Sequence, residues 1–257
     1  MPDVLSGFRV LDVSTHGVVP IAGSVLASWG ADVVKIEDPE HGDIMRGGTV
    51  WGVPPPEGGS CHLYHIFNHG KRSAAINLKH ERGHEALLRL VDTSDVFLTS
   101  FLSPVRRRLG IDVDDIRARR PDIVYARNTG RGTKGPEAEL GGFDATSFWS
   151  RAGLAAATSA PEQGLPTAMP APAFGDSQTG FALAAGVVAA LLHRERTGAG
   201  TVVDTSLLNT GMWSMQTAIV TSTMLGAEEL RRPPRGSGAP LVNSYRTRDG
   251  RHVHLCM

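Results

Sequence analysis

The sequence predicts a doubly wound α/β fold, in which helices cover both faces of a parallel sheet. Short apolar runs suited to buried strands alternate with helical segments through the first half of the chain. Stretches rich in glycine and proline separate these segments. The 257 residues, 41% of them hydrophobic, suffice for one large domain, or for one domain and part of a second.

The first elements form a strand–helix–strand unit. Arg9–Val13 and Asp32–Glu37 are typical of buried strands, and residues 21–29 are predicted to form a helix between them. Because a helix crosses over from one strand to the next, the two strands are expected to run parallel. The glycine- and proline-rich residues 38–60 are predicted to form a long loop.

The alternation continues up to residue 127. We expect a strand over 73–78, an amphipathic helix over Glu81–Val91, a strand over 95–101, a helix over Val113–Arg119 and a strand over 123–127. This order indicates a Rossmann-like parallel sheet.

The second half of the chain is more helical. The sequence predicts a helix over 144–156, a proline-rich loop over 161–172 and a long helix from about Asp176 to 196. The glycines of 197–200 suit a left-handed stop to that long helix. A strand over 202–205 and a second long helix over 207–225 follow.

The chain is predicted to divide into a large domain, 1–226, a linker, 227–241, and the start of a smaller second domain, 242–257. Val242–Arg246 and His252–Cys256 flank a turn and are typical of a β-hairpin. An isolated hairpin is marginally stable. We therefore expect that it pairs with another part of the fold, or that the second domain is incomplete.

Composition excludes several classes of protein. Lys+Arg and Asp+Glu both number 26, so the basic excess of a nucleic-acid-binding protein is absent. The two cysteines lie far apart, which fits a reducing compartment. The first ten residues do not resemble a signal peptide, and the longest apolar run, 181–192, is too short to span a bilayer. We expect a cytoplasmic protein with neither nucleic acid nor membrane as a partner.

The motif Gly175-Asp176-Ser177 stands where the long helix is predicted to begin. An aspartate at a helix N-cap is usually structural, because its oxygen accepts a hydrogen bond from a free backbone N–H. The same N–H groups and the helix dipole could instead hold the carboxylate ionised as a nucleophile. They could also stabilise an oxyanion on an attacked carbonyl. The pattern alone leaves both interpretations open.

Other short motifs give weaker evidence of function. Cys61, His65 and His69 are spaced for one helix face, but they lack a fourth ligand, so no metal site is expected. Residues 70–73 lack the upstream glycine of a phosphate-binding P-loop. No G-x-G-x-x-G motif follows the first strand, which argues against a dinucleotide oxidoreductase.

Several sequence blocks occur in a characteristic order and spacing. They are LSGFRVLD at 5–12, LASWGADVVKIE at 26–37, Gly42-Asp43 with Arg46, Phe67-Asn68 with Lys71-Arg72-Ser73, Arg108-Leu109-Gly110, Gly175-Asp176-Ser177 and RTGAG at 196–200. Together they resemble the class III CoA-transferases, or CaiB/BaiF family, which includes formyl-CoA transferase and 2-methylacyl-CoA racemase. The resemblance covers nearly the whole chain.

The resemblance implies that the α/β domain binds coenzyme A and that the aspartate matching Asp176 attacks an acyl-CoA thioester. The implied cycle passes through a mixed anhydride and an aspartyl-CoA thioester, after which a carboxylic acid accepts CoA. The acyl group stays energised throughout, so no ATP is needed. Coenzyme A enters as part of the substrate, and no permanently bound cofactor is expected.

The resemblance also points to residues that would contact CoA. Lys71 and Arg108 match CoA-contacting positions, and Arg72 is a weaker candidate; for each the alternative is a solvated surface charge. Residues 15–20 would line the CoA site, and Val18 stands there where the family has a smaller residue. Asp38 likewise occupies a position that is basic in formyl-CoA transferase.

Phe143-Asp144 bears on the branch of the family. The racemase branch carries a His-Asp pair there, because inverting a carbon by deprotonation and reprotonation needs two bases. Phe143 cannot serve as a base; if a second base exists, His16 and His69 are the first candidates. Asp144 would orient the substrate or the nucleophile, or would only cap a helix.

A CoA-transferase is therefore the expected function, with a 2-methylacyl-CoA racemase or epimerase and a non-catalytic acyl-CoA-binding subunit as alternatives. Acyl-CoA and a carboxylic acid are the expected substrates. Family members are longer and form interlocked homodimers, so we expect a homodimer or a companion subunit. The apolar residues Leu165, Met169 and Phe174 suggest a non-polar acyl group.

Overall fold

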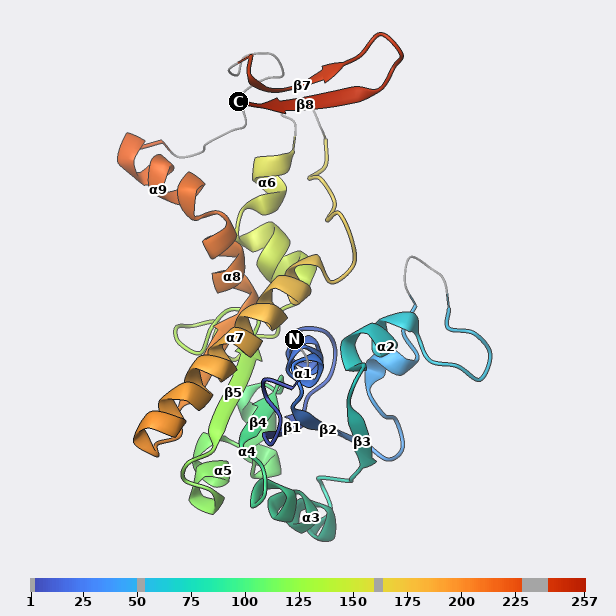
Figure 1. The fold of residues 1–257 in the computed structure, drawn as a ribbon, viewed down its shortest axis with the longest axis vertical. Helices are drawn as coiled ribbons and strands as arrows, with labels where there is room; N and C mark the ends of the chain where they lie inside the picture. The colour runs from blue at the N-terminus through green and yellow to red at the C-terminus, as the bar shows by residue number, and fades with distance from the viewer. Residues whose placement is uncertain (1–2, 50–53, 160–163, 228–239) are drawn as a thin grey trace.

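The computed structural model describes residues 3–49, 54–159, 164–227 and 240–257. Its centre is a sheet of six parallel strands in the order β3-β2-β1-β4-β5-β6 (Figure 1). The strands are β1 Arg9–Val13, β2 Asp32–Glu37, β3 Arg72–Ala75, β4 Val96–Thr99, β5 Val124–Thr129 and β6 Val202–Ser206. The predicted Rossmann-like α/β fold is confirmed.

Alternate residues of the strands pack on opposite faces of the sheet. On one face, Val10 of β1 lies in a core with residues of α1 (Val18–Ser28) and α7 (Phe174–Thr197). On the other face, Leu11 lies in a core with residues of α3 (Glu81–Val91) and α5 (Val113–Arg119). Burial on both faces explains why the strands read as continuous apolar runs.

Two short helices were not predicted. α2 spans His62–Asn68, and α4 spans Ser103–Leu109. Each has only seven residues, so the helical period in either is weak. α4 nevertheless carries a proline in its first turn and ends at Gly110 in the left-handed conformation, with φ 61°, which are ordinary start and stop signals. The predicted loop 38–60 also contains a short 3-10 helix, η1 Ile44–Arg46.

Two predicted long helices are interrupted. The segment 144–156 forms a π-helix, η2 Asp144–Arg151, and then α6 Leu154–Thr158, with Gly153 at φ 93° between them. The segment 207–225 forms α8 Leu207–Ser214 and α9 Gln216–Leu225, which meet at Met215.

α7 is the only helix in the described ranges that is long and apolar enough to cross a membrane. It packs instead on the sheet, against α1 and beside β5 and β6 (Figure 1). The contact with α1 is close because residue 180 is glycine: a Cβ there would lie 2.7 Å from the carbonyl oxygen of Val18. α7 is therefore a core helix whose second turn, at Gly180, lies against the first turn of α1.

The hairpin of β7 Val242–Arg246 and β8 His252–Cys256 forms as predicted and lies at one end of the molecule, away from the six-stranded sheet (Figure 1). Most of the predicted linker, 228–239, lies outside the described residues. The division into two domains stays a prediction.

Candidate active site

Asp176 lies in the first turn of α7, three residues past the N-cap Ala173, and not at the N-cap itself as the sequence suggested. Its carboxylate faces the loop that joins β1 to α1. A Cβ on Gly17 would lie 2.2 Å from Oδ2 of Asp176, so only glycine leaves room for this carboxylate. The loop follows the carboxyl end of a central strand, which is where ligands bind in open α/β sheets.

Asp144 is the first residue of η2 and lies beside the start of α7. Its Oδ1 and Oδ2 accept hydrogen bonds from the backbone N–H of Gly175 at 3.1 and 3.0 Å. Gly175 is needed here as well, since a Cβ would come within 2.4 Å of Oδ1 of Asp144 and 2.2 Å of the Phe148 ring. The structure thus brings both predicted catalytic carboxylates together.

The free N–H groups of α7 serve a different carboxylate from the one expected. They were predicted to keep Asp176 ionised, but the Gly175 N–H donates to Asp144. Burial, with a smaller contribution from the charge of Asp144, raises the pKa of Asp176 to about 7. Burial also raises the pKa of Asp144, although backbone N–H groups of Asp176 and Gly175 offset part of that effect. The prediction of a firmly ionised Asp176 was wrong in this respect.

His16 directly precedes Gly17, the residue that contacts Asp176. Its backbone is left-handed, with φ 70°, and its exposed imidazole lies 5.9 Å from the Phe143 ring, measured between centroids. Nδ1 is 2.9 Å from the hydroxyl of Thr15. His69, by contrast, contacts the carbonyl of Ile66 and the hydroxyl of Ser28, which is at the carboxyl end of α1. Of the two histidines, only His16 is near the carboxylate pair.

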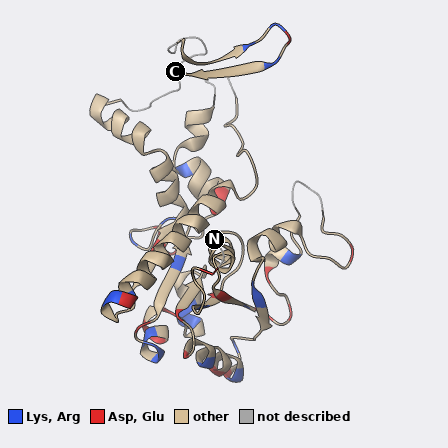
Figure 2. Ribbon diagram, viewed as in Figure 1, with Lys and Arg blue, Asp and Glu red and all other residues tan. Residues whose placement is uncertain are grey.

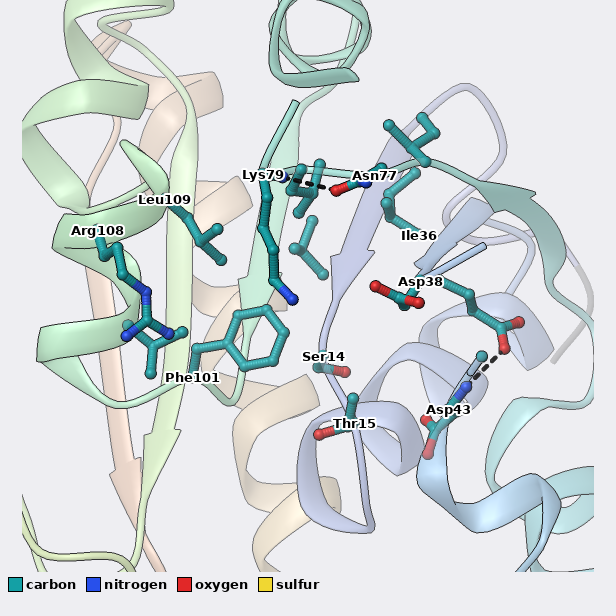
Figure 3. Close-up of a pocket in the computed structure, with 16 residues that line it drawn as sticks. Ser14, Thr15, Ile36, Asp38, Asp43, Asn77, Lys79, Phe101, Arg108 and Leu109 are labelled. Atoms are coloured by element: carbon teal, nitrogen blue, oxygen red, sulfur yellow. Dashed lines mark hydrogen bonds between the residues drawn. The ribbon is translucent and has the colours of Figure 1, made fainter. Parts of the chain in front are cut away.

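A cavity of about 230 Å³ opens at the carboxyl ends of β1, β2 and β4. It lies at the switch point of the sheet, where the strand order reverses between β1 and β4. Figure 3 shows the side chains of Lys79 and Arg108 on either side of the Phe101 ring. Neither cation has an ion-pair partner within the described ranges, so both are available to a phosphorylated ligand.

Lys79 was missed by the sequence reasoning because it lies in a turn outside the recognisable blocks. Its backbone N–H donates to the side chain of Asn77, which fixes the turn after β3. Asp38 lines the same cavity and accepts backbone N–H groups of Glu40 and His41, which lower its pKa. The cavity wall therefore combines the two cations with three carboxylates, Glu37, Asp38 and Asp43. Glu37 is paired with Arg46 and Asp43 with Lys35.

Of the four side chains singled out for CoA, Lys71, Arg72, Arg108 and Val18, only Arg108 lies in this cavity, although Thr15 of the expected segment 15–20 also lines it. The Arg72 side chain pairs with Asp32 at 2.6 Å, at the amino ends of β3 and β2, on the opposite edge of the sheet. Val18 is buried in an apolar cluster with Phe148. The CoA roles of Arg72 and Val18 stay predictions that this placement does not favour.

Lys71 has a buried side chain, and its ammonium group uses all three of its donors inside the protein. It donates to Oδ2 of Asp12, to the carbonyl of Pro20 and to the side chain of Asn68, at 2.7, 2.7 and 2.9 Å. No proton is left for a phosphate, so its predicted contact with CoA is not favoured either. Instead, Lys71 ties β1 to α1 and thereby helps to hold the loop that carries Gly17.

A second buried lysine, Lys35 of β2, also holds the loop between β1 and α1. Nζ of Lys35 donates to the carbonyl of Ser14 and pairs with Asp43, both at 2.9 Å. Burial alone would raise the pKa of Asp12, but Lys35 and Lys71 together lower it. This network of buried charges and hydrogen bonds holds residues 14–17, with Thr15 on the cavity and Gly17 against Asp176.

The sequence was compared with protein-family models. The model for CoA-transferase family III matches residues 5–257. This chain therefore belongs to CoA-transferase family III. The resemblance seen in the sequence blocks is confirmed.

Individual relatives agree with the family. The (R)-2-hydroxy-4-methylpentanoate CoA-transferase of Clostridioides difficile is 34% identical over 99% of this chain and 62% of its own length. The formyl-CoA:oxalate CoA-transferase of Streptomyces coelicolor is 38% identical over 79% of this chain and 47% of its own length. A solved CAIB/BAIF family protein from Brucella suis superposes with a TM-score of 0.84 at 28% identity, over 98% of this chain and 65% of that chain. The present chain thus spans about three fifths of the length of the first relative.

Proposed function

We propose that this protein transfers coenzyme A from an acyl-CoA to a carboxylic acid, with Asp176 as the nucleophile. The observation that carries the proposal is the placement of Asp176 beside Asp144 and Gly17, at the same edge of the sheet as the cavity with Arg108 and Lys79. Arg108 and Lys79 would bind the phosphates of CoA. Thr15 lines that cavity and lies two residues from Gly17, which is at most about 7 Å along an extended chain.

The chemistry proceeds in four steps. A carboxylate oxygen of Asp176 attacks the thioester carbonyl, the C–S bond breaks, and CoA leaves as a thiolate. The thiolate attacks the Asp176 side of the resulting anhydride, which releases the donor acid and leaves an aspartyl-CoA thioester. The acceptor carboxylate attacks that thioester and again displaces the thiolate. The thiolate finally attacks the acceptor carbonyl, which gives the new acyl-CoA and restores Asp176.

Asp144 acts through its neighbours in this scheme. It accepts the Gly175 N–H and so fixes the first turn of α7, and its charge adds to the larger effect of burial, which raises the pKa of Asp176. The composition favours a cytoplasmic location, and the family resemblance favours a homodimer or a companion subunit that completes the site.

The proposal is tested by the conversion of an acyl-CoA and a free acid into the exchanged pair, followed by chromatography. The Asp176→Asn variant, which keeps the shape of the side chain, is expected to lose at least 1000-fold in rate, as removal of a nucleophile does. The Asp114→Asn variant, changed at an exposed carboxylate of α5, is a matched control and is expected to keep its rate. Full turnover by Asp176→Asn would reject this role, and acyl-CoA binding without any turnover would favour the non-catalytic subunit.

A racemase remains the second candidate, because His16 brings an imidazole to the position beside Phe143. Incubation of a chiral 2-methylacyl-CoA in heavy water tests it. A transferase leaves the α-carbon unlabelled, which is the expected result. Rapid deuterium incorporation that the His16→Gln variant abolishes would assign the protein to the racemase branch.

A further inference from the structure

A second cavity, of about 560 Å³, opens beside η2 and the loop that precedes α7. Ala145 and Trp149 of η2, Ala155 of α6, and residues 166–169 and 171–172 form most of its wall. Its volume is within the range of small-molecule binding sites. None of the described residues that line it carries a charge, and Figure 2 shows α6 free of charged side chains.

The cavity shares its walls with the segments that hold the two carboxylates. Ala145 directly follows Asp144 in η2. The Trp149 ring packs edge-on against Phe174, with centroids 6.1 Å apart, and Phe174 is two residues before Asp176. The wall of the cavity is thus connected, through Ala145 and through the Trp149–Phe174 contact, to the two segments that carry Asp144 and Asp176.

Two polar side chains of the wall already donate to backbone carbonyls. Nε1 of Trp149 donates to the carbonyl of Thr167 at 2.7 Å, and the Ser150 hydroxyl donates to the carbonyl of Ala145 at 2.7 Å. The described wall offers no cation to a carboxylate. A ligand that placed a second carboxylate here would lose its hydration without gaining a counter-charge.

We propose that this cavity receives the acyl group and selects apolar monocarboxylic acyl groups over dicarboxylic ones of the same length. The inference rests on the proposed transferase function and adds its substrate class. The occupant is an aliphatic or aromatic acyl chain, which displaces water from an apolar wall.

The test compares hexanoyl-CoA with adipoyl-CoA, which have equal chain length and differ by one terminal carboxylate. Binding of each to the purified protein is measured by calorimetry, and CoA transfer to acetate by chromatography. Hexanoyl-CoA is expected to bind and react at least ten times better. The preference is expressed as the ratio of the hexanoyl-CoA value to the adipoyl-CoA value. Ala168→Arg, which adds a cation to the wall, is expected to lower this ratio at least threefold. Ala156→Arg changes an exposed residue of α6 outside the wall and is expected to leave the hexanoyl-to-adipoyl ratio unchanged.

The outcomes separate the two proposals. Equal or better binding and transfer of adipoyl-CoA would overturn the inference and leave the transferase function standing. Preferred binding of hexanoyl-CoA without transfer of either substrate would support the cavity assignment and reject the transferase. If Ala168→Arg and Ala156→Arg change the hexanoyl-to-adipoyl ratio equally, the acyl group binds outside this cavity and the inference is overturned.

Discussion

At the scale of single residues, the site depends on how two carboxylates share the start of one helix. Asp144 takes the Gly175 N–H, and Asp176 is left in a half-buried position beside that carboxylate. A pKa of about 7 means that roughly half of the Asp176 side chains are ionised at neutral pH. The carboxylate is then a stronger base than an ordinary aspartate and a better nucleophile.

This arrangement predicts the pH dependence of transfer. The attacking form of Asp176 is ionised, so the rate is expected to rise with pH, with a midpoint near 7, and to level off above it. Asp144→Asn removes a negative charge but keeps an oxygen that can accept the Gly175 N–H. The pKa of Asp176 should then fall, and the midpoint should move to lower pH. Initial rates between pH 5.5 and 8.5 measure the shift.

Glu139→Gln is the control for that experiment, since it removes an exposed carboxylate paired with Arg107. Its midpoint should stay in place. An identical midpoint in wild type and Asp144→Asn would show that the charge of Asp144 does not act on Asp176.

The residue scale is also where sequence reasoning reached its limit. Asp176, Asp144 and Arg108 could be chosen because they lie in recognisable blocks. Lys79 could not, because its place in the cavity depends on the turn after β3 and on α4 across the switch point. The burial of Lys71 likewise depends on Asp12 and Asn68, which lie 59 and 3 residues away in the chain.

At the scale of elements, the site depends on the close approach of α1 and α7. α1 begins next to Gly17 and α7 carries Asp176, so their contact sets the distance between loop and nucleophile. The sequence predicted both helices but placed their starts three and two residues late. The first turns contain Val18 and Gly175. Their tertiary contacts help to set where each helix begins, and helix propensity alone does not determine those contacts.

Gly180→Ala tests the importance of this contact. The new Cβ would lie 2.7 Å from the Val18 carbonyl oxygen and 2.8 Å from Cγ2 of Ile21, so the helices must separate. Overpacking of this kind costs roughly 1–3 kcal/mol, which exceeds the gain in helix propensity of at most about 1 kcal/mol. We expect a net loss of unfolding free energy in urea and a slower transfer rate.

Gly141→Ala is the matched change, because a Cβ at residue 141 meets no atom within 4 Å. Its unfolding free energy should match the wild type within about 0.5 kcal/mol. A Gly180→Ala variant as stable and active as wild type would mean that the helices tolerate a wider spacing.

At the scale of the whole molecule, one end of the chain presents an uncharged surface. α8 and α9 contain no Asp, Glu, Lys or Arg, as Figure 2 shows. Several of their large apolar side chains are exposed: Met212, Trp213, Val220, Met224 and Leu225. Trp213 is 71% and Met224 81% exposed. A group of large exposed apolar side chains on two adjoining helices is typical of an interaction site.

We therefore expect self-association or a companion subunit at this surface. Sedimentation velocity at micromolar concentration should show a species heavier than the 27.3 kDa chain. Trp213→Lys should shift the distribution towards the single chain, because the new charge would be desolvated in the contact. Leu140→Lys, at an exposed position in the loop before η2, should leave the distribution of species unchanged. A fully active 27.3 kDa species would argue against a shared site.

The most direct test of the whole account is mass spectrometry of the protein after incubation with acyl-CoA and hydroxylamine. Hydroxylamine converts an aspartyl anhydride or thioester into a stable hydroxamate, which peptide sequencing can locate. The account predicts a hydroxamate on Asp176, formed only when acyl-CoA is present and absent from Asp176→Asn. A protein that transfers CoA while Asp176 stays unmodified, or that carries the hydroxamate on another residue, would contradict it.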